Sequence, residues 1–118
     1  MKKLSIGQRG EIIAARYLEK LGFKIIEKNL KIGYLELDLI AQKSKSIYFF
    51  EVKTRQNKKV VQQDNILTKN QILNLKKAAK IYLATNTRYY QNFYFNLILI
   101  NLNLKNKNAT IIHYSNIF

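Results

Sequence analysis

Asp38, Glu51 and Lys53 have the types and the spacing that could bind a divalent metal ion beside a phosphate group. Thirteen residues separate the two acids, a distance at which a hairpin could bring two strand ends together. Carboxylates that share a site repel one another unless a cation lies between them, and hard oxygen ligands suit Mg²⁺ or Mn²⁺. Lys53, two residues beyond Glu51 on the same strand face, could orient or deprotonate an attacking water. The residue types and their spacing therefore predict a site for a metal ion and a phosphate group.

The surroundings of these acids favour a site over an ordinary surface pair. Glu-x-Lys alone is a weak pattern, because the same spacing also forms Glu–Lys pairs on a solvated strand face. Glu51, however, follows the apolar run 47–50, where an acid is unfavourable. Glu36 and Asp38 alternate with leucines and therefore point the same way from their strand. Acids embedded in strands need a stabilising partner, and a metal ion is the partner we expect.

The charge balance favours nucleic acid as the binding partner. The chain has 21 Lys and Arg against 7 Asp and Glu, a formal net charge of +14 and an isoelectric point near 10. Each phosphate that such a surface neutralises releases condensed counterions and so favours binding. The alternative is that the lysines only keep the surface solvated. The side chains that we expect to contact phosphates are Lys58, Lys59, Lys69, Lys76, Lys77 and Lys80.

Composition excludes several other classes of protein. The 118 residues can bury one core, so we expect a single domain over residues 1–118. Without cysteine the chain can form neither disulfides nor thiolate zinc sites. The basic start leads into an amphipathic helix pattern rather than an apolar signal core, and every apolar run is far shorter than the ~20 residues of a membrane helix. We therefore expect a cytoplasmic protein that does not enter a membrane.

The elements that must position these residues follow from hydrophobic periodicity. Ser5 with Gln8 and Thr68 with Gln71 have the spacing of capping boxes, and each pair precedes apolar residues at helical intervals. Gly22 is a natural end for the first helix. We predict the order helix, three strands, helix, two strands, with expected bounds 5–22, 23–28, 35–40, 47–53, a second helix after Thr68 with the buried stripe Ile72, Leu75, Ala79 and Leu83, then 93–102 and 110–114.

The predicted connections complete the fold class. Asn29 and Gly33 are expected to flank the first turn, residues 44–46 to form the second, and residues 54–65 to form a mobile loop. The run 47–50 is apolar on both faces, which is typical of a central strand, and three successive strands need at least one antiparallel hairpin. We therefore predict an α/β fold, an α/β/α sandwich with a mixed central sheet.

Three blocks of residues carry a resemblance to a known family. They are Gly7-x-x-Gly10-Glu11-x-x-Ala14-Ala15-x-Tyr17-Leu18-x-x-x-Gly22, Gly33-x-x-Glu36-x-Asp38-Leu39-Ile40-Ala41 and Phe50-Glu51-Val52-Lys53-Thr54-Arg55. Together they make nearly the whole chain resemble the YraN family of small bacterial proteins. That family is similar to the restriction-endonuclease-like superfamily, which includes archaeal Holliday-junction resolvases and whose signature is an aspartate followed by a Glu-x-Lys strand.

The resemblance implies roles for individual residues. Asp38, Glu51 and the backbone carbonyl of Val52 match the metal ligands, and Lys53 matches the lysine near the attacking water. Glu11 matches an acid that faces the site from the first helix and joins the catalytic and metal-binding set. The alternative for Glu11 is a first-turn acid that stabilises the helix dipole.

Residues around this set are expected to assist it. Glu36 either supports the metal ligands or pairs with Arg55, and Thr54 and Arg55 would lie at the edge of the site and could hold a phosphate. Two positions depart from the family pattern: Asn96 stands where an aspartate is usual, and Lys69-Asn70-Gln71 replaces a Lys-Gln step. Aromatic and imidazole groups elsewhere are expected to be mainly structural, namely His113, Tyr89, Tyr90 and Tyr94, although the tyrosines could also stack on bases.

The expected function is therefore that of a metal-dependent endonuclease acting on nucleic acid, with DNA favoured over RNA and branched or recombination DNA as a candidate substrate. The first alternative is a non-catalytic nucleic-acid-binding module in repair, recombination or DNA uptake. A ribosome-associated basic protein is a third reading, but it leaves the strand-borne acids unexplained. Resolvase-like enzymes cut paired strands with two active sites, so the resemblance also raises the prospect of a homodimer.

Overall fold

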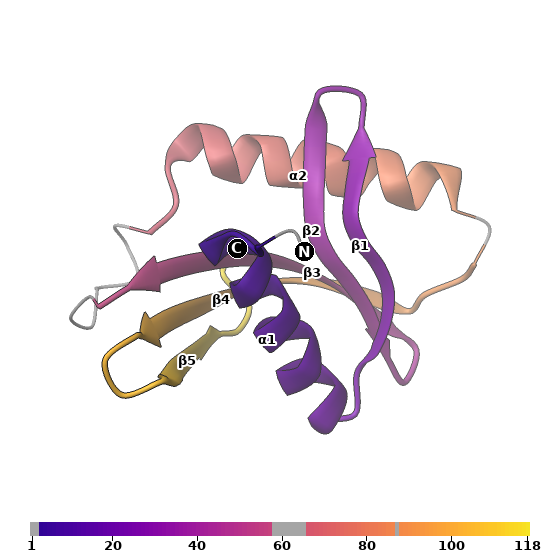
Figure 1. The fold of residues 1–118 in the computed structure, drawn as a ribbon. Coiled ribbons are helices and arrows are strands. Elements are labelled where there is room, and N and C mark those ends of the chain that lie inside the picture. Colours follow the sequence, from indigo (N-terminus) through magenta and orange to yellow (C-terminus); the bar gives the residue numbers. More distant parts are fainter. Residues whose placement is uncertain (1–2, 58–65, 87) are drawn as a thin grey trace.

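A computed structural model describes residues 3–57, 66–86 and 88–118. Within these residues five strands form one sheet, and two helices pack on it (Figure 1). In chain order the elements are α1 (Ile6–Lys20), β1 (Lys24–Ile32), β2 (Leu35–Lys43), β3 (Ser46–Gln56), α2 (Lys69–Thr85), β4 (Asn92–Asn103) and β5 (Asn108–Tyr114). The predicted order of helix, three strands, helix and two strands is confirmed.

The sheet is mixed, as the sequence predicts. Its strands lie in chain order, β1-β2-β3-β4-β5, and only β3 and β4 pair in parallel. Parallel neighbours cannot be joined by a tight turn, so a long crossover is required, and α2 lies in that crossover. The architecture is compatible with the restriction-endonuclease-like α/β fold.

Each helix begins at the capping box that the sequence predicts. The Ser5 hydroxyl accepts from Gln8 N at 3.1 Å while Gln8 Oε1 accepts from Ser5 N at 2.8 Å. Thr68 and Gln71 repeat this arrangement at 3.1 and 2.9 Å. Such reciprocal bonds satisfy backbone donors that the first turn of a helix leaves unpaired. The second box fixes the N-terminus of α2 and, with it, the position of Gln71.

The two helices cover opposite faces of the sheet and create two apolar layers. On the first face, small α1 side chains let the helix approach the strands closely; this cluster includes Ala14, Ala15, Leu18, Leu39, Ala41, Phe50, Val52, Ile98 and Ile100. On the second face, α2 packs on the hairpin and β3; this cluster includes Leu35, Leu37, Ile40, Ile47, Phe49, Leu75, Ala78, Ala79 and Tyr82. The sandwich that the sequence predicts is therefore present.

A glycine sets how closely α1 approaches β3. A Cβ atom at Gly10 would lie only 1.8 Å from the hydroxyl oxygen of Thr54, a separation at which two atoms cannot coexist. Gly10 is buried, and the next residue of the helix is Glu11. The absence of a side chain at Gly10 thus lets α1 lie directly on β3 and carry Glu11 toward the strand ends.

All five strands are longer than the sequence predicts, and the extensions of β1 and β3 change the predicted connections. β1 continues through Asn29 to Ile32, because Asn29 adopts a left-handed backbone (φ 51°) that asparagine tolerates and pairing with β2 continues beyond it. The turn is therefore Gly33-Tyr34 rather than 29–33. β3 continues to Gln56, because its last three residues pair with residues 100–102 of β4. Residues 54–56 thus belong to a strand, and the described part of the predicted loop is shorter than expected.

His113 is held in a polar network, consistent with the structural role expected from the sequence. The Asn96 amide nitrogen lies 2.9 Å from Nε2 of His113, and the Tyr17 hydroxyl lies 3.0 Å from Nδ1. Because an amide nitrogen only donates, Nε2 accepts and the neutral ring carries its proton on Nδ1. Burial lowers the pKa of His113, which favours this neutral form. Asn96 also accepts from the backbone N–H of Asn116 at 3.0 Å, so its amide both donates and accepts, whereas an ionised aspartate could only accept.

Among the described residues, neither helix combines the length and the apolar character needed to cross a membrane.

Candidate active site

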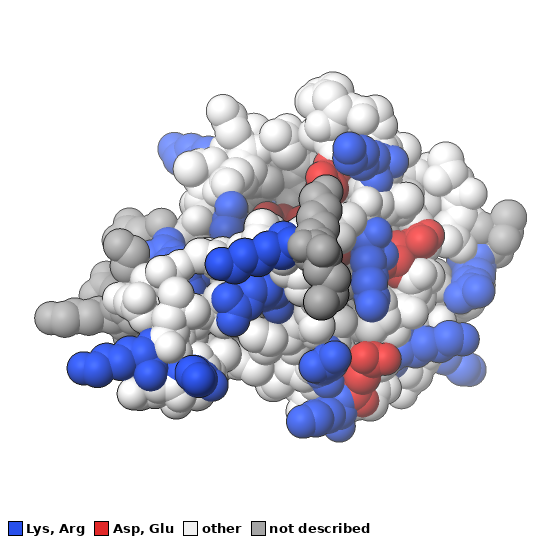
Figure 2. All heavy atoms as spheres, in the orientation of Figure 1, with Lys and Arg blue, Asp and Glu red and all other residues white. Residues whose placement is uncertain are grey.

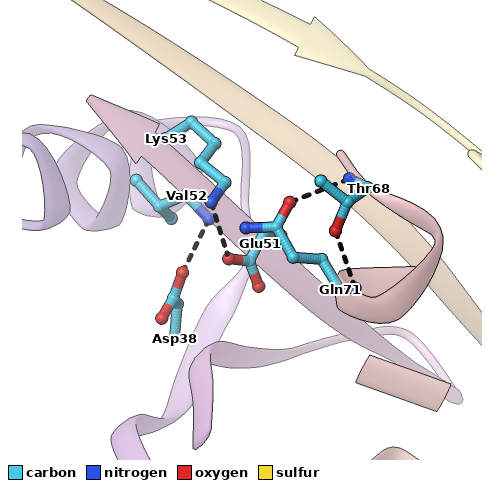
Figure 3. A network of polar contacts seen from close by, with 6 residues as sticks. All are labelled: Asp38, Glu51, Val52, Lys53, Thr68 and Gln71. Carbon is cyan, nitrogen blue, oxygen red and sulfur yellow. Dashed lines mark hydrogen bonds and ion pairs between the residues drawn. The ribbon is translucent and has the colours of Figure 1, made fainter. Parts of the chain in front are cut away.

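β2 and β3 separate at the point where their acids would meet. Their pairing runs from Lys43–Ser46 to Leu39–Phe50. One further step in this register would place Asp38 directly opposite Glu51, and like charges opposite one another destabilise a sheet. Instead, the backbone N–H of Val52 donates to Asp38 Oδ2 at 2.9 Å (Figure 3). A carboxylate therefore occupies the place of a backbone acceptor, and a gap opens between the strands.

The side chains of β2 pack against different helices on either side of this separation. Leu35 and Leu37 contact the α2 cluster, whereas Leu39 and Ala41 contact the α1 cluster. Asp38 lies between these pairs, at the position where the strand passes from one layer to the other. On the tip side of Asp38, the β1–β2 hairpin leaves the rest of the sheet and runs across α2 (Figure 1). Asp38 therefore faces the gap between the two strands.

The structure brings together the three side chains that the sequence singles out. The Asp38 and Glu51 carboxyl groups lie close enough for each to shift the pKa of the other. Lys53 Nζ lies 3.9 Å from Glu51 Oε1, and the two side chains are only 29% and 19% exposed. Figure 3 shows Glu51 and Lys53 near the same end of β3, with the Lys53 ammonium group turned toward the Glu51 carboxyl group. The trio is compact and partly shielded from solvent.

Burial and mutual repulsion set the protonation of the pair. Burial, followed by the charge of Asp38, raises the pKa of Glu51 to about 8, and the ammonium of Lys53 offsets only part of this shift. Burial also raises the pKa of Asp38 against the stabilising N–H of Val52. In the absence of a metal ion, the raised pKa therefore favours a Glu51 carboxyl group that holds a proton at neutral pH. A divalent cation could replace that proton, because it neutralises both carboxylates at once.

Glu11 and Glu36 extend the acidic cluster on the α1 side of the gap. Burial and the charges of Asp38 and Glu36 raise the pKa of Glu11. Asn29 lies between them: with its amide nitrogen turned toward the acids, it donates to Glu11 and to Glu36 Oε1 at 3.3 Å. Glu11 and Glu36 therefore lie near one another, on either side of the Asn29 amide.

The donor set fits a hard divalent cation. It offers carboxylate oxygens, and the carbonyl of Val52 should face the same gap, because the N–H and C=O of one strand residue point to the same side. Within residues 3–57, 66–86 and 88–118, no three acidic or histidine side chains are already spaced to hold one ion. Binding would therefore require Glu51 to lose its proton and both carboxylates to turn toward the ion.

The start of α2 forms the other wall of the site. Gln71 uses its carbonyl oxygen in the capping box, and Figure 3 shows its amide nitrogen on the side of Glu51. Gln71 and Asn74 line, together with Tyr34, Glu36 and Glu51, a cleft of about 160 Å³. On the α1 side, Glu11 and Asn29 line a second cleft of about 210 Å³. Glu36 and Glu51 thus border one small cleft, and Glu11 borders the other.

The other residues that the sequence singles out lie on β3, on α2 or outside the described residues. Thr54 faces α1 and packs against Gly10, so its hydroxyl lies on the opposite strand face from Lys53. Lys69 occupies the first turn of α2. Lys77 donates to the Tyr34 hydroxyl at 3.0 Å. Lys76 and Lys80 instead line a separate cleft of about 590 Å³ with Phe93, Phe95 and Phe118. Lys58 and Lys59 lie outside the described residues.

Basic side chains surround the acids. Figure 2 shows Lys and Arg side chains spread over the face that carries α1, with few acidic side chains among them. Four of the seven acids of the chain belong to the cluster at the gap, namely Glu11, Glu36, Asp38 and Glu51. In the described part of the chain, Lys53 and Glu51 form the one contact within 4.0 Å between a basic and an acidic side chain. The acids therefore gather with one another rather than with the abundant cations.

Comparison with known proteins places the chain among small bacterial relatives. The model of "Uncharacterised protein family UPF0102" matches residues 10–100, a span that contains the acidic cluster, Lys53 and Gln71. The UPF0102 protein of Syntrophomonas wolfei is 41% identical over 95 residues, 80% of this chain and 83% of that protein. Those of Lawsonia intracellularis and Caldanaerobacter subterraneus are 34% identical over 118 residues and 38% over 104, covering 100% and 87% of this chain and 88% and 84% of the relatives.

Proposed function

The chain belongs to the uncharacterised protein family UPF0102, the YraN family, and we propose that it hydrolyses phosphodiester bonds of nucleic acid with the aid of a divalent metal ion. One observation carries the proposal: in a chain of net charge +14, four of seven acids converge on the gap between β2 and β3 beside Lys53. Acids that served only stability would pair with the plentiful lysines.

Each residue of the cluster has a distinct part in this proposal. Asp38, Glu51 and the carbonyl of Val52 would hold Mg²⁺ or Mn²⁺, and Glu11 would add a carboxylate or hold a water from the α1 side. The metal ion would lower the pKa of a bound water and neutralise charge on the phosphate. Lys53 would direct its ammonium to the attacking water or to a phosphate oxygen, because it is held beside Glu51 at the mouth of the site.

The basic surface would supply affinity for the substrate. Lysines contact phosphates without reading sequence, so they position a strand rather than select it. Lys69 lies on the first turn of α2, which also carries Gln71. We propose DNA as the substrate to be tested first, with branched, flapped and single-stranded forms compared.

Cleavage assays with purified protein test the proposal. The wild-type protein should cut DNA in Mg²⁺ or Mn²⁺, and Asp38→Ala or Lys53→Ala should abolish cutting while nucleic-acid binding remains. Glu19→Gln is the matched control for Glu11→Gln, because Glu19 is an exposed acid on the same helix and lies outside the cluster. Equal cleavage by wild type, Asp38→Ala and Lys53→Ala would trace the activity to a contaminant and refute the proposal.

The bond between Val52 N–H and Asp38 favours a second function. A carboxylate that replaces a backbone acceptor can serve simply to end the pairing of two strands. The protein would then be a non-catalytic nucleic-acid-binding module. Calorimetry separates the two functions: this second one predicts no heat of Mg²⁺ or Mn²⁺ binding and a tighter complex of Asp38→Ala with DNA, since a like charge has been removed.

A further inference from the structure

The tip of the β1–β2 hairpin carries an exposed aromatic side chain beside the acids. Tyr34 is 81% exposed and lines the same cleft as Glu36 and Glu51. A single exposed aromatic side chain is ordinary on a protein surface. Tyr34 differs because it borders carboxylates at a candidate active site and because its position is fixed from two sides.

The turn and α2 both hold Tyr34 in place. Ile32 pairs with Leu35, so Gly33 and Tyr34 form a two-residue turn, and the φ of +61° at Gly33 matches the tight type II′ connection. Lys77 Nζ donates to the Tyr34 hydroxyl at 3.0 Å and lies 5.4 Å from the ring centre. A ring held in this way can bind a flat ligand without first losing much rotational freedom.

A row of polar side chains on α2 leads from the acids to this ring. Gln71, Asn74 and Lys77 recur every three residues and therefore share one side of the helix. Gln71 lies beside Glu51, Asn74 lines the cleft, and Lys77 reaches Tyr34. Amide and ammonium groups donate to phosphates and base edges, and an aromatic ring stacks on a base. The row thus has the chemistry of a path for one nucleic-acid strand.

We infer that Tyr34 stacks on the base of an unpaired nucleotide of DNA while Lys77 contacts its phosphate, and that the strand continues along α2 to the acids. This inference rests on the proposed function and narrows its substrate class. A base within a duplex already stacks on both of its neighbours, so its face is not available to Tyr34. The site therefore selects DNA with single-stranded character, such as a tail, a flap or a junction with unpaired nucleotides.

Binding and cleavage are measured separately on the full chain. In a cleavage-deficient Lys53→Ala background, fluorescence anisotropy compares a duplex that carries a single-stranded tail with a blunt duplex of the same base pairs. Tyr34→Ala should weaken binding of the tailed DNA by about tenfold, the usual effect of removing one stacking side chain, and change binding of the blunt duplex by less than about twofold. Tyr34→Phe keeps the ring and should retain most of the affinity.

Tyr89→Ala is the matched control. Tyr89 is 84% exposed, and its loop is bonded through Gln91 N–H to the carbonyl of Lys45 at the opposite end of β3 from Glu51. Its replacement should leave the tailed DNA bound as before. Circular dichroism and thermal unfolding confirm that each variant is folded before its affinity is compared.

The outcomes separate the inference from the proposed function. Equal effects of Tyr34→Ala and Tyr89→Ala, equal losses for tailed and blunt DNA, or no DNA binding at all would overturn the inference. If the wild-type protein binds tailed DNA in a Tyr34-dependent way but does not cleave it, the binding site is supported and the proposed nuclease activity is refuted. If cleavage and binding are both unchanged by Tyr34→Ala, the proposed nuclease activity stands and the stacking site at Tyr34 is refuted.

Discussion

The carboxyl group of Glu51 is held where ionisation is costly. Its pKa is raised to about 8, chiefly by burial and then by the charge of Asp38. A group whose pKa is raised on folding contributes its full stability below the pKa of the unfolded chain and loses it as the pH rises through the folded value. For Glu51 this window runs from 4.5 to about 8. The metal-free fold should therefore weaken across neutral pH, as is common where function constrains a site.

Glu51→Gln should remove this weakness. In EDTA, the variant should exceed wild type in free energy of unfolding by about 1 kcal/mol or more near pH 9, with a smaller difference near pH 5. Urea unfolding at the two pH values measures the difference. Glu19→Gln, an exposed acid of α1, should show no such gain. Added Mg²⁺ should stabilise wild type and not Glu51→Gln, and a Glu51→Gln protein less stable than wild type near pH 9 would contradict the account.

The positions of the residues on strands can be predicted from the alternation of apolar and polar side chains. Asp38, Glu51 and Lys53 could be placed because alternation fixes their face and the hairpin spacing fixes their strand ends. The pattern predicts a turn beside Asn29, because the left-handed backbone of Asn29 within β1 leaves no signal in the hydrophobic periodicity. Nothing in the sequence marks Tyr34, because its place beside Glu51 depends on the course of the hairpin tip, which is separate from β3.

At the scale of elements, the contact of α1 with β3 decides whether Glu11 reaches the site. Gly10→Ala should force the helix away, because its Cβ would lie 1.8 Å from the Thr54 hydroxyl oxygen. We expect a loss of about 2 kcal/mol or more in free energy of unfolding, typical of overpacking. Chemical denaturation measures this loss, and metal affinity should fall with it.

Gly7→Ala is the matched control for Gly10→Ala. Its Cβ would meet only the Ser5 hydroxyl oxygen at 3.9 Å, an ordinary contact. Since alanine is the better helix former, this variant should gain up to about 1 kcal/mol. Equal stabilities of the two variants would show that the helix can shift without cost.

The starts of the helices can be predicted from the sequence more completely than the ends of the strands. Capping boxes are local, so both helix starts could be identified from four residues. The ends of β1 and β3 depend on what their neighbours offer: the polar residues 54–56 stay in a strand because β4 lies beside them. The separation of β2 from β3 is likewise a property of the assembled sheet, although the two acids that coincide with it are visible in the sequence.

For the whole molecule, the net charge of +14 predicts DNA binding that weakens steeply with salt. The logarithm of affinity should fall with the logarithm of salt concentration, and removing one phosphate contact should reduce the slope by about 1. Lys69→Ala, at the start of α2, should show this reduction. Lys20→Ala, in the last turn of α1, should not. Anisotropy titrations across salt concentrations measure the slopes, and equal slopes in both variants would mean that the lysines act only as diffuse charge.

The bond from Val52 N–H to Asp38 gives the protein a built-in spectroscopic probe. The chain has no tryptophan, so the usual intrinsic fluorophore for following ligand binding is missing. The Val52 amide instead donates to an ionisable oxygen, and a charge-assisted hydrogen bond is shorter and stronger than a neutral one. The resonance of this single amide in a two-dimensional NMR spectrum should therefore move when Asp38 gains a proton or a cation. The amide at the point where β2 and β3 stop pairing would therefore report directly whether a proton or a metal ion is bound at Asp38.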